Sequence, residues 1–234
     1  MKRKIVLMFI TVMSFPIIGL AQDRADNAEE QIMHARMGDV KSDTYFDKLV
    51  DETALVYSAI AKGKQGEVPA IVLSKARCIA ILPDVKTGAL VIGGTHGEGL
   101  ASCKTSDNTW SQPVPTSINQ GSIGLQAGVK SVDLVLFFQD EKAEMALKRG
   151  EFELGTDVSV VAGRFDSNID TSNAGVVVYS RAKGLFAGAS INGSKIGKDQ
   201  DKIIQCYGKS ADYAALLESP QDSGYATKLT KLFP

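Results

Sequence analysis

Positive charge is concentrated in two segments of a chain that is slightly acidic overall. The 234 residues include 26 Lys and Arg against 27 Asp and Glu, a net charge of −1. Lys62–Lys86 has five basic and two acidic residues, and Tyr179–Lys198 has four basic and no acidic residue. If the two segments meet in the fold, they form a cationic surface that can hold phosphate through charge-assisted hydrogen bonds; the alternative is a scatter of solvated lysines. The candidate anion-binding residues are Lys75, Arg77, Arg181, Lys183 and Lys195.

The motifs of nucleotide binding and hydrolysis are incomplete. Gly93–Gly99 superficially resembles a phosphate loop, but strand-like sequence follows it where a dinucleotide fingerprint requires a helix, so we expect a tight turn with bulges. Gly193–Asp199 lacks the glycine spacing of a P-loop and the Ser or Thr after its lysine. The two histidines, His34 and His96, make a poor metal site, and no G-x-S-x-G elbow accompanies them. We expect His96 to be an exposed turn residue.

Two carboxylates, Asp84 and Asp133, could in principle act as an acid and a base, but nothing in the sequence places them together. Asp133 lies beside an apolar run and is expected to be a strand-end or hydrogen-bonded structural residue. We therefore predict that the protein is not an enzyme and uses no cofactor or metal.

Three cysteines are present: Cys78, Cys103 and Cys206. The chain has no C-x-x-C pair, so their spacing matches no zinc motif. Cys78 and Cys103 lie in apolar, strand-like runs, and we favour their interpretation as small buried hydrophobic residues. Whether any of the three pair is left open.

The first 21 residues have the pattern of a signal peptide. Lys2, Arg3 and Lys4 precede an apolar stretch, and Ala21 suits the small-residue cleavage rule, so cleavage before Gln22 is expected. The alternative is an uncleaved anchor, although the stretch is short for a membrane span. We therefore expect an exported protein, periplasmic or secreted, and possibly peripheral on a membrane. Loss of three basic residues makes the remainder more acidic, which argues against nucleic-acid binding.

The secondary-structure pattern changes from helical to β and back. Residues 46–60 repeat apolar side chains at helical spacing, and Pro69 begins a short helix through Lys75. Asp140–Arg149 is a second clear helix, closed by Gly150. Helical patterns return at Ala211–Leu217 and Tyr225–Leu232.

Short β runs fill the middle of the chain. Cys78–Leu82 and Ala89–Ile92 flank a turn and predict a hairpin, while the nearly continuous apolar run Val132–Phe138 predicts a central strand. We predict an α+β fold, in which N-terminal helices precede a mainly antiparallel, barrel- or sandwich-like β domain with short C-terminal helices.

Glycines inside strand-like sequence, which normally weaken a sheet, indicate bulges or close backbone contacts. They occur in Ala80–Gly99 and Tyr179–Gly188. Between these segments come Trp110–Pro113, Gly121–Gly128 and Leu154–Asp157. In this order and spacing, the chain resembles the SYLF family over roughly Ala54 to Leu217.

The resemblance implies a non-enzymatic domain that binds phospholipid, with anionic phospholipid or a membrane surface as partner. Eukaryotic members of that family favour phosphoinositides and can also contact actin. The expected organisation is therefore a signal peptide at 1–21, a polar extension at 22–42 and a single SYLF-like lipid-binding domain at 43–234. The five basic residues named above would then bind the lipid headgroup. The alternative is a structural or protein-interaction module of the cell envelope.

Overall fold

An eight-stranded sheet organises the part of the chain that the computed structural model describes, which is residues 45–63, 66–89, 92–123, 129–157, 159–162, 174–183, 193–220, 224 and 226–234. The strand order is β7-β10-β5-β4-β3-β6-β9-β8. All neighbours are antiparallel except β8 and β9. The strands are β3 (Cys78–Ala89), β4 (Ile92–Cys103), β5 (Val114–Ile123), β6 (Val129–Phe138), β7 (Glu151–Glu153), β8 (Val160–Ala162), β9 (Val176–Lys183) and β10 (Lys195–Lys198).

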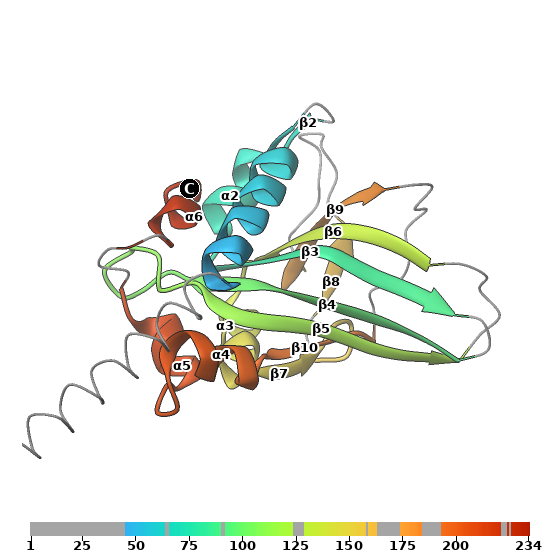
Figure 1. The fold of residues 1–234 in the computed structure, drawn as a ribbon. Helices are drawn as coiled ribbons and strands as arrows, with labels where there is room; N and C mark the ends of the chain where they lie inside the picture. The colour runs from blue at the N-terminus through green and yellow to red at the C-terminus, as the bar shows by residue number, and fades with distance from the viewer. Residues whose placement is uncertain are drawn as a thin grey trace, which may run out of the picture. The chain divides into compact units, whose positions relative to one another are not determined.

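Helices cover both faces of this sheet toward one end of its long strands (Figure 1). One face packs against the helix over residues 45–61, α2 (Ala70–Lys75) and α6 (Thr227–Thr230). The other face packs against α3 (Glu141–Arg149), α4 (Gln200–Tyr207) and α5 (Tyr213–Glu218). A two-stranded pair, β1 (Lys62–Gly63) and β2 (Gly66–Glu67), follows the first helix. The α+β prediction, with helices at both ends, is confirmed, and the β part is a half-barrel sheet.

The apolar strand β6 shows why the sheet is sandwiched between helices. Leu134, Leu136 and Phe138 belong to the core shared with α3, α4 and α5, whereas Val135 and Phe137 belong to the core on the opposite face. Since successive side chains point to opposite faces, a strand buried on both sides is expected to be largely apolar. The predicted interior position of this run is confirmed.

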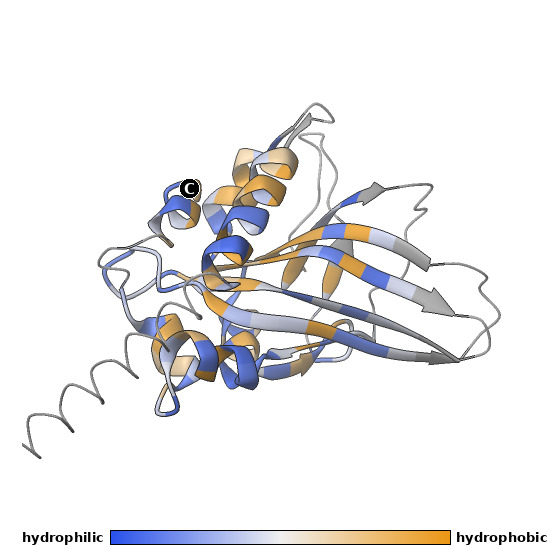
Figure 2. Cartoon of the chain, in the orientation of Figure 1, coloured by the Kyte–Doolittle hydropathy of each residue, from blue (hydrophilic) through white to orange (hydrophobic). Residues whose placement is uncertain are grey.

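The long strands differ in hydropathy from one end to the other, as well as between their two faces. Their hydrophobic positions gather where the helices lie, and hydrophilic positions follow further along the strands (Figure 2). The sheet therefore has a covered end that stabilises the fold and an end on which polar side chains reach the surface.

A β-bulge in β3 separates these two ends. Between Leu82 and Val85 the strand advances three residues while its partner β6 advances two, from Leu134 to Val132. One extra residue in one strand exchanges the faces toward which all later side chains point. Val85 consequently stays in the core, at 0% exposure, and Lys86 is exposed. Asp84, within the bulge, has a left-handed φ of 51°.

Two glycines in β4 make room for the bulge. A Cβ on Gly99 would lie 1.9 Å from the carbonyl oxygen of Ile81, and one on Gly97 would lie 2.7 Å from Cγ2 of Val85. The expectation of close backbone contacts is confirmed at this segment. The expectation of a tight turn over Gly93–Gly99 is wrong, because these residues continue β4 through its pairing with both β3 and β5.

The predicted hairpin is also displaced. Residues 84–88 do not form its turn, because β3 continues through them to Ala89 after the bulge, and β4 begins at Ile92. The helix at 141–149 matches the prediction closely: Asp140 Oδ1 accepts from the Ala143 N–H at 2.7 Å, and Gly150 ends the helix with a φ of 82°.

Cys78 and Cys103 are buried, as expected, and they form a disulfide, a pairing that the sequence had left open. They lie directly opposite each other at the covered ends of β3 and β4. Cys206 is a free, partly buried thiol. Residues 1–42 and the second glycine segment at 184–188 lie outside the described residues, so the expectations for them remain predictions.

The close approach at Gly99 generates a stability prediction. Gly99→Ala places a methyl group against the backbone of β3, which cannot yield without disturbing the bulge, so we expect a loss of about 3 kcal/mol. The matched control is Gly121→Ala in β5, where an added Cβ meets nothing within 4 Å. That control should change stability by about 0.5 kcal/mol or less. Denaturant unfolding measures the free energy of unfolding of both variants. Equal losses in the two variants would contradict the role given to Gly99, which is to make room for the bulge in β3.

Candidate functional site: a polar row across the sheet

Six polar residues form one continuous row across six neighbouring strands beyond the bulge. Each is the printed register partner of the next, so all six positions belong to the same face of the sheet. From β10 to β9 the row, here called the cross-sheet row, consists of Lys195, Asn119, His96, Lys86, Ser131 and Lys183. At about 4.8 Å per strand, its positions span about 24 Å.

The row lies on the same sheet face as the helix over residues 45–61. Its neighbours along the strands, such as Val85, Ile118 and Ile196, point into the opposite core. Lys86, His96, Asn119 and Lys195 are exposed, and Ser131 is half-buried. Beyond the bulge, these strands thus keep hydrophobic side chains in the core on one face of the sheet. On the other face, in the part that none of the described helices covers, they present the basic row.

Short polar contacts hold several members of the row. His96 Nδ1 and Asn119 Oδ1 are 2.7 Å apart. Lys86 Nζ lies 2.7 Å from Asp84 Oδ2, and the hydroxyl of Ser131 also donates to Asp84. Lys195 Nζ lies 3.7 Å from Glu151 Oε1, a distance that leaves the ammonium largely solvated, with its side chain 61% exposed. Exposed ion pairs of this kind contribute about 0–1 kcal/mol, so the lysines can exchange partners with a ligand.

An ion pair between a buried carboxylate and a half-buried guanidinium lies directly beside the row. Asp133 is 2% exposed, and its Oδ2 accepts from Arg181 Nη2 at 2.7 Å and from Nε at 3.1 Å. Its Oδ1 accepts from the backbone N–H of Asp84 at 3.0 Å. Asp133 is therefore the hydrogen-bonded structural residue that was expected, and it connects Arg181 to the bulge.

The start of the 45–61 helix borders the same face. Tyr45 Oη donates to Glu98 Oε2 at 2.8 Å, next to an open pocket of about 310 Å³ that includes Lys48, Lys86 and His96. Burial of the phenol, together with the hydrogen bond to Glu98, raises the pKa of Tyr45, so this side chain stays a neutral donor. The row therefore has one wall, made by the first turns of this helix.

Lys75 and Arg77 lie at the other end of the sheet. Lys75 is exposed in the last turn of α2, and the Arg77 N–H donates to the Phe138 carbonyl, where β3 and β6 begin to pair. The pairing advances seven residues along β6 from Phe138 to Ser131, so Arg77 is about 24 Å from the row. The structure brings Lys183 and Lys195 into one row, places Arg181 beside it, and leaves Lys75 and Arg77 apart.

The sequence could not single out Asn119, Ser131 and His96 as members of this row, because only the strand register aligns them with the lysines. Lys86 was counted within the first basic segment, but a strict alternation from Leu82 would have placed it in the core. For Lys183 the structure gives the register position, not the side chain.

Arg77 instead belongs to a chain of four charges that joins β3 to α3 and α5. Arg77 Nε pairs with Glu144, whose Oε1 lies 2.9 Å from Lys148 Nζ, and Lys148 also lies 3.3 Å from Glu218 Oε1. Burial raises the pKa of Glu144, but the hydrogen bonds and charges of Lys148 and Arg77 outweigh burial, and the net result is a lowered pKa. Glu144 is therefore a structural anion that keeps two basic residues in place.

The lowered pKa of Glu144 predicts a specific pH dependence. A carboxyl group with a depressed folded-state pKa stabilises the fold above its unfolded pKa of about 4.3, and this stabilisation is lost as pH falls through the folded value. Glu144→Gln should cost about 2 kcal/mol at pH 7, and this difference from the wild type should shrink below pH 4. Thermal unfolding from pH 7 to pH 3 measures it, with exposed Glu141→Gln on the same helix as the control. A cost that is independent of pH would refute the charged role.

Within the described ranges, no group of three or more His, Cys, Asp or Glu residues could hold a metal ion. No helix among the described residues is long and apolar enough to cross a membrane.

Comparison with known proteins finds a family model and relatives that are similar in sequence. Residues 119–233 match the family model described as "Ysc84: Las17-binding protein actin regulator". Protein YSC84 of Saccharomyces cerevisiae is 30% identical over 163 residues, which cover 66% of this chain and 35% of the yeast protein. The human SH3 domain-containing YSC84-like protein 1 is 34% identical over 133 residues, which cover 54% of this chain and 39% of the human protein. The chain thus matches little more than a third of these relatives' length. No solved structure matches.

Proposed function

We propose that this protein, whose residues 119–233 match the Ysc84 family model, is a non-catalytic binding protein of the cell envelope that holds anionic phospholipid headgroups, or a related amphiphile, on its cross-sheet row. The single observation that carries the proposal is the register that aligns Lys86, Lys183 and Lys195 on one sheet face. A row of about 24 Å is longer than one headgroup, so it suits the plane of a membrane better than a single ligand.

Electrostatic attraction on the row contributes to reversible binding. Each Lys near an anionic membrane surface contributes about 1 kcal/mol, so three contribute about 3 kcal/mol. The acidic balance of the whole chain opposes indiscriminate adsorption, and binding then requires this face to point toward the membrane. His96 and Asn119, between the lysines, add polar groups that can bond phosphate oxygens.

Arg181 has a positioning role in this proposal. Its guanidinium bonds the buried carboxylate of Asp133, which also holds the bulge beside Lys86. Replacing Arg181 would leave a buried charge unpaired, so a variant at this position tests stability before it tests binding.

The buried disulfide supports the export part of the proposal. Disulfides form and persist in oxidising compartments and are rare where thiols are kept reduced. The Cys78–Cys103 bond is consistent with a signal peptide over residues 1–21 and with a periplasmic or secreted protein.

A protein partner is the second candidate function. The yeast relative LAS seventeen-binding protein 3 is 29% identical over 163 residues, and its name describes protein binding. On this chain, Leu55 and Ile71 are large exposed hydrophobic residues, at 70% and 46% exposure, on the 45–61 helix and on α2. An interaction module would use this helical surface and not the cross-sheet row.

The lipid proposal predicts salt-sensitive binding that depends on the row. Co-sedimentation with vesicles of phosphatidylglycerol and phosphatidylcholine should weaken strongly between 0.1 M and 1 M salt, because the screening length falls from about 10 Å to about 3 Å. The triple variant Lys86→Gln, Lys183→Gln and Lys195→Gln should bind at least about tenfold more weakly and keep a normal melting temperature.

The matched control removes three positive charges elsewhere, through Lys142→Gln, Lys209→Gln and Lys231→Gln, none of which lies in a strand. If the control loses as much binding as the row variant, net charge and not the row governs adsorption. If neither variant loses binding, the contact lies elsewhere and the assignment fails. A row variant that binds vesicles normally, combined with loss of a protein partner in Leu55→Ser, favours the second candidate.

A further inference from the structure

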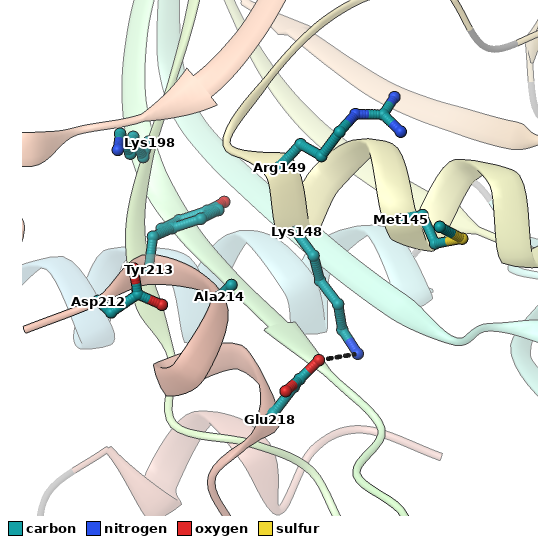
Figure 3. Close-up of a pocket in the computed structure, with 8 residues that line it drawn as sticks. All are labelled: Met145, Lys148, Arg149, Lys198, Asp212, Tyr213, Ala214 and Glu218. Atoms are coloured by element: carbon teal, nitrogen blue, oxygen red, sulfur yellow. Dashed lines mark hydrogen bonds and ion pairs between the residues drawn. The ribbon is translucent and has the colours of Figure 1, made fainter.

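An open pocket of about 460 Å³ lies on the sheet face opposite the cross-sheet row, between α3, β10 and α5. Figure 3 shows Arg149 at the end of α3, Lys198 on β10 and Tyr213 at the start of α5, with the Arg149 guanidinium drawn pointing away from Lys198. The pocket is lined by Met145, Lys148, Arg149, Lys198, Asp212, Tyr213, Ala214 and Glu218. Its volume falls within the range of about 300–1,000 Å³ that small-molecule sites occupy.

Most of the charges in the pocket already have structural partners. Lys148 pairs with Glu144 and Glu218, and Figure 3 marks its contact with Glu218. Asp212 caps α5, since its Oδ1 accepts from the Ala215 N–H at 2.9 Å. Arg149 and Lys198, in contrast, form no ion pair with a carboxylate in the part of the chain that the structure describes. Three cations against two carboxylates leave the lining with one net positive charge.

Lys198 is held in place by its backbone and by its stem. Its N–H donates to the Gly150 carbonyl at 2.7 Å. A Cβ on Gly150 would lie 3.1 Å from Lys198 Cδ and 3.3 Å from Tyr213 Cδ1, so the lysine stem and the phenol ring both pack over this glycine. A side chain whose stem is already packed loses less conformational entropy on binding a ligand, which makes this lysine a better anion contact than a lysine with a free stem.

An apolar contact lies beside these cations. Met145 is 53% exposed, one of three large exposed hydrophobic residues in the described part of the chain. Its flexible thioether adapts to irregular apolar groups. Met145, Ala214 and the Tyr213 ring therefore offer contacts for the apolar part of a ligand whose charged end meets the cations that line the same pocket.

We propose that this pocket binds a small organic monocarboxylate with an apolar chain or ring. The single net positive charge of the lining matches a monoanion better than a phosphate monoester, which carries about −1.5 to −2 at pH 7. The planar guanidinium of Arg149 matches the two oxygens of a carboxylate, and Lys198 adds a second positive charge on a packed stem. The site is separate from the cross-sheet row and does not depend on the proposed lipid function.

The test is a chemical-shift titration of the purified protein with hexanoate, hexanol and hexyl phosphate. Hexanoate should shift amide signals of α3, α5 and β10 and should bind at least tenfold more tightly than hexanol. The double variant Arg149→Gln and Lys198→Gln should weaken hexanoate binding at least tenfold. The variant Lys142→Gln and Lys209→Gln, which removes the same charge outside the pocket, should bind hexanoate normally. Met145→Ser should weaken hexanoate binding and leave acetate binding unchanged.

Several results would overturn the proposal. Hexanoate that shifts no signal in these elements at 20 mM, or that binds the double variant normally, means the pocket is not a carboxylate site. Tighter binding of hexyl phosphate than of hexanoate refutes the monocarboxylate class. The row variant Lys86→Gln, Lys183→Gln and Lys195→Gln must keep hexanoate binding; if it does not, the two sites are not separate.

Discussion

The hydrogen bond between the Asp84 N–H and the carboxylate of Asp133 holds the one irregularity on which the rest of this surface depends. It fixes a bulge that adds a single residue to β3, so that Val85 stays in one core and Lys86 faces the other side. Without the extra residue, strict alternation from Leu82 would direct Lys86 into the hydrophobic core. Arg181 donates a hydrogen bond to the carboxylate of Asp133. Gly97 and Gly99, on the neighbouring strand β4, leave the space that the bulge needs.

The bulge also explains how one sheet serves two purposes. Toward the disulfide, the strands are buried between helices on both faces, and most of their residues are apolar. Past the bulge, one face continues as core and the other becomes polar, with the helix over residues 45–61 as a wall. The basic residues that look like one group in the sequence are therefore divided. Arg77 and Lys148 brace α3 through Glu144, and Lys86, Lys183 and Lys195 form the row.

Local patterns predicted the elements whose environment is uniform. Val132–Phe138 reads as an interior strand because both of its faces are buried, and the helix after Asp140 is marked by its own cap and by Gly150. The glycine segment 93–99 reads as a turn, because the sequence does not show that glycines there accommodate a neighbouring strand. The sequence of β5 has few apolar residues on its uncovered face. Its pattern therefore does not predict a strand over most of Val114–Ile123. Likewise, the pairing of Cys78 with Cys103 and the alignment of the row depend on register, which is a long-range property.

The measurement that tests the central claim most directly is the cross-strand NMR contact pattern of Asp133→Ala, compared with Ser131→Ala. Ser131→Ala removes only the side-chain bond to Asp84 and should keep both the contact between the Lys86 and Ser131 backbones and the slow hydrogen exchange of the Asp84 N–H. Asp133→Ala should lose both, because the carboxylate that accepts from Asp84 is gone. An Asp133→Ala protein that retains the contact and the protected amide would show that the bulge, and with it the position of Lys86, does not depend on Asp133.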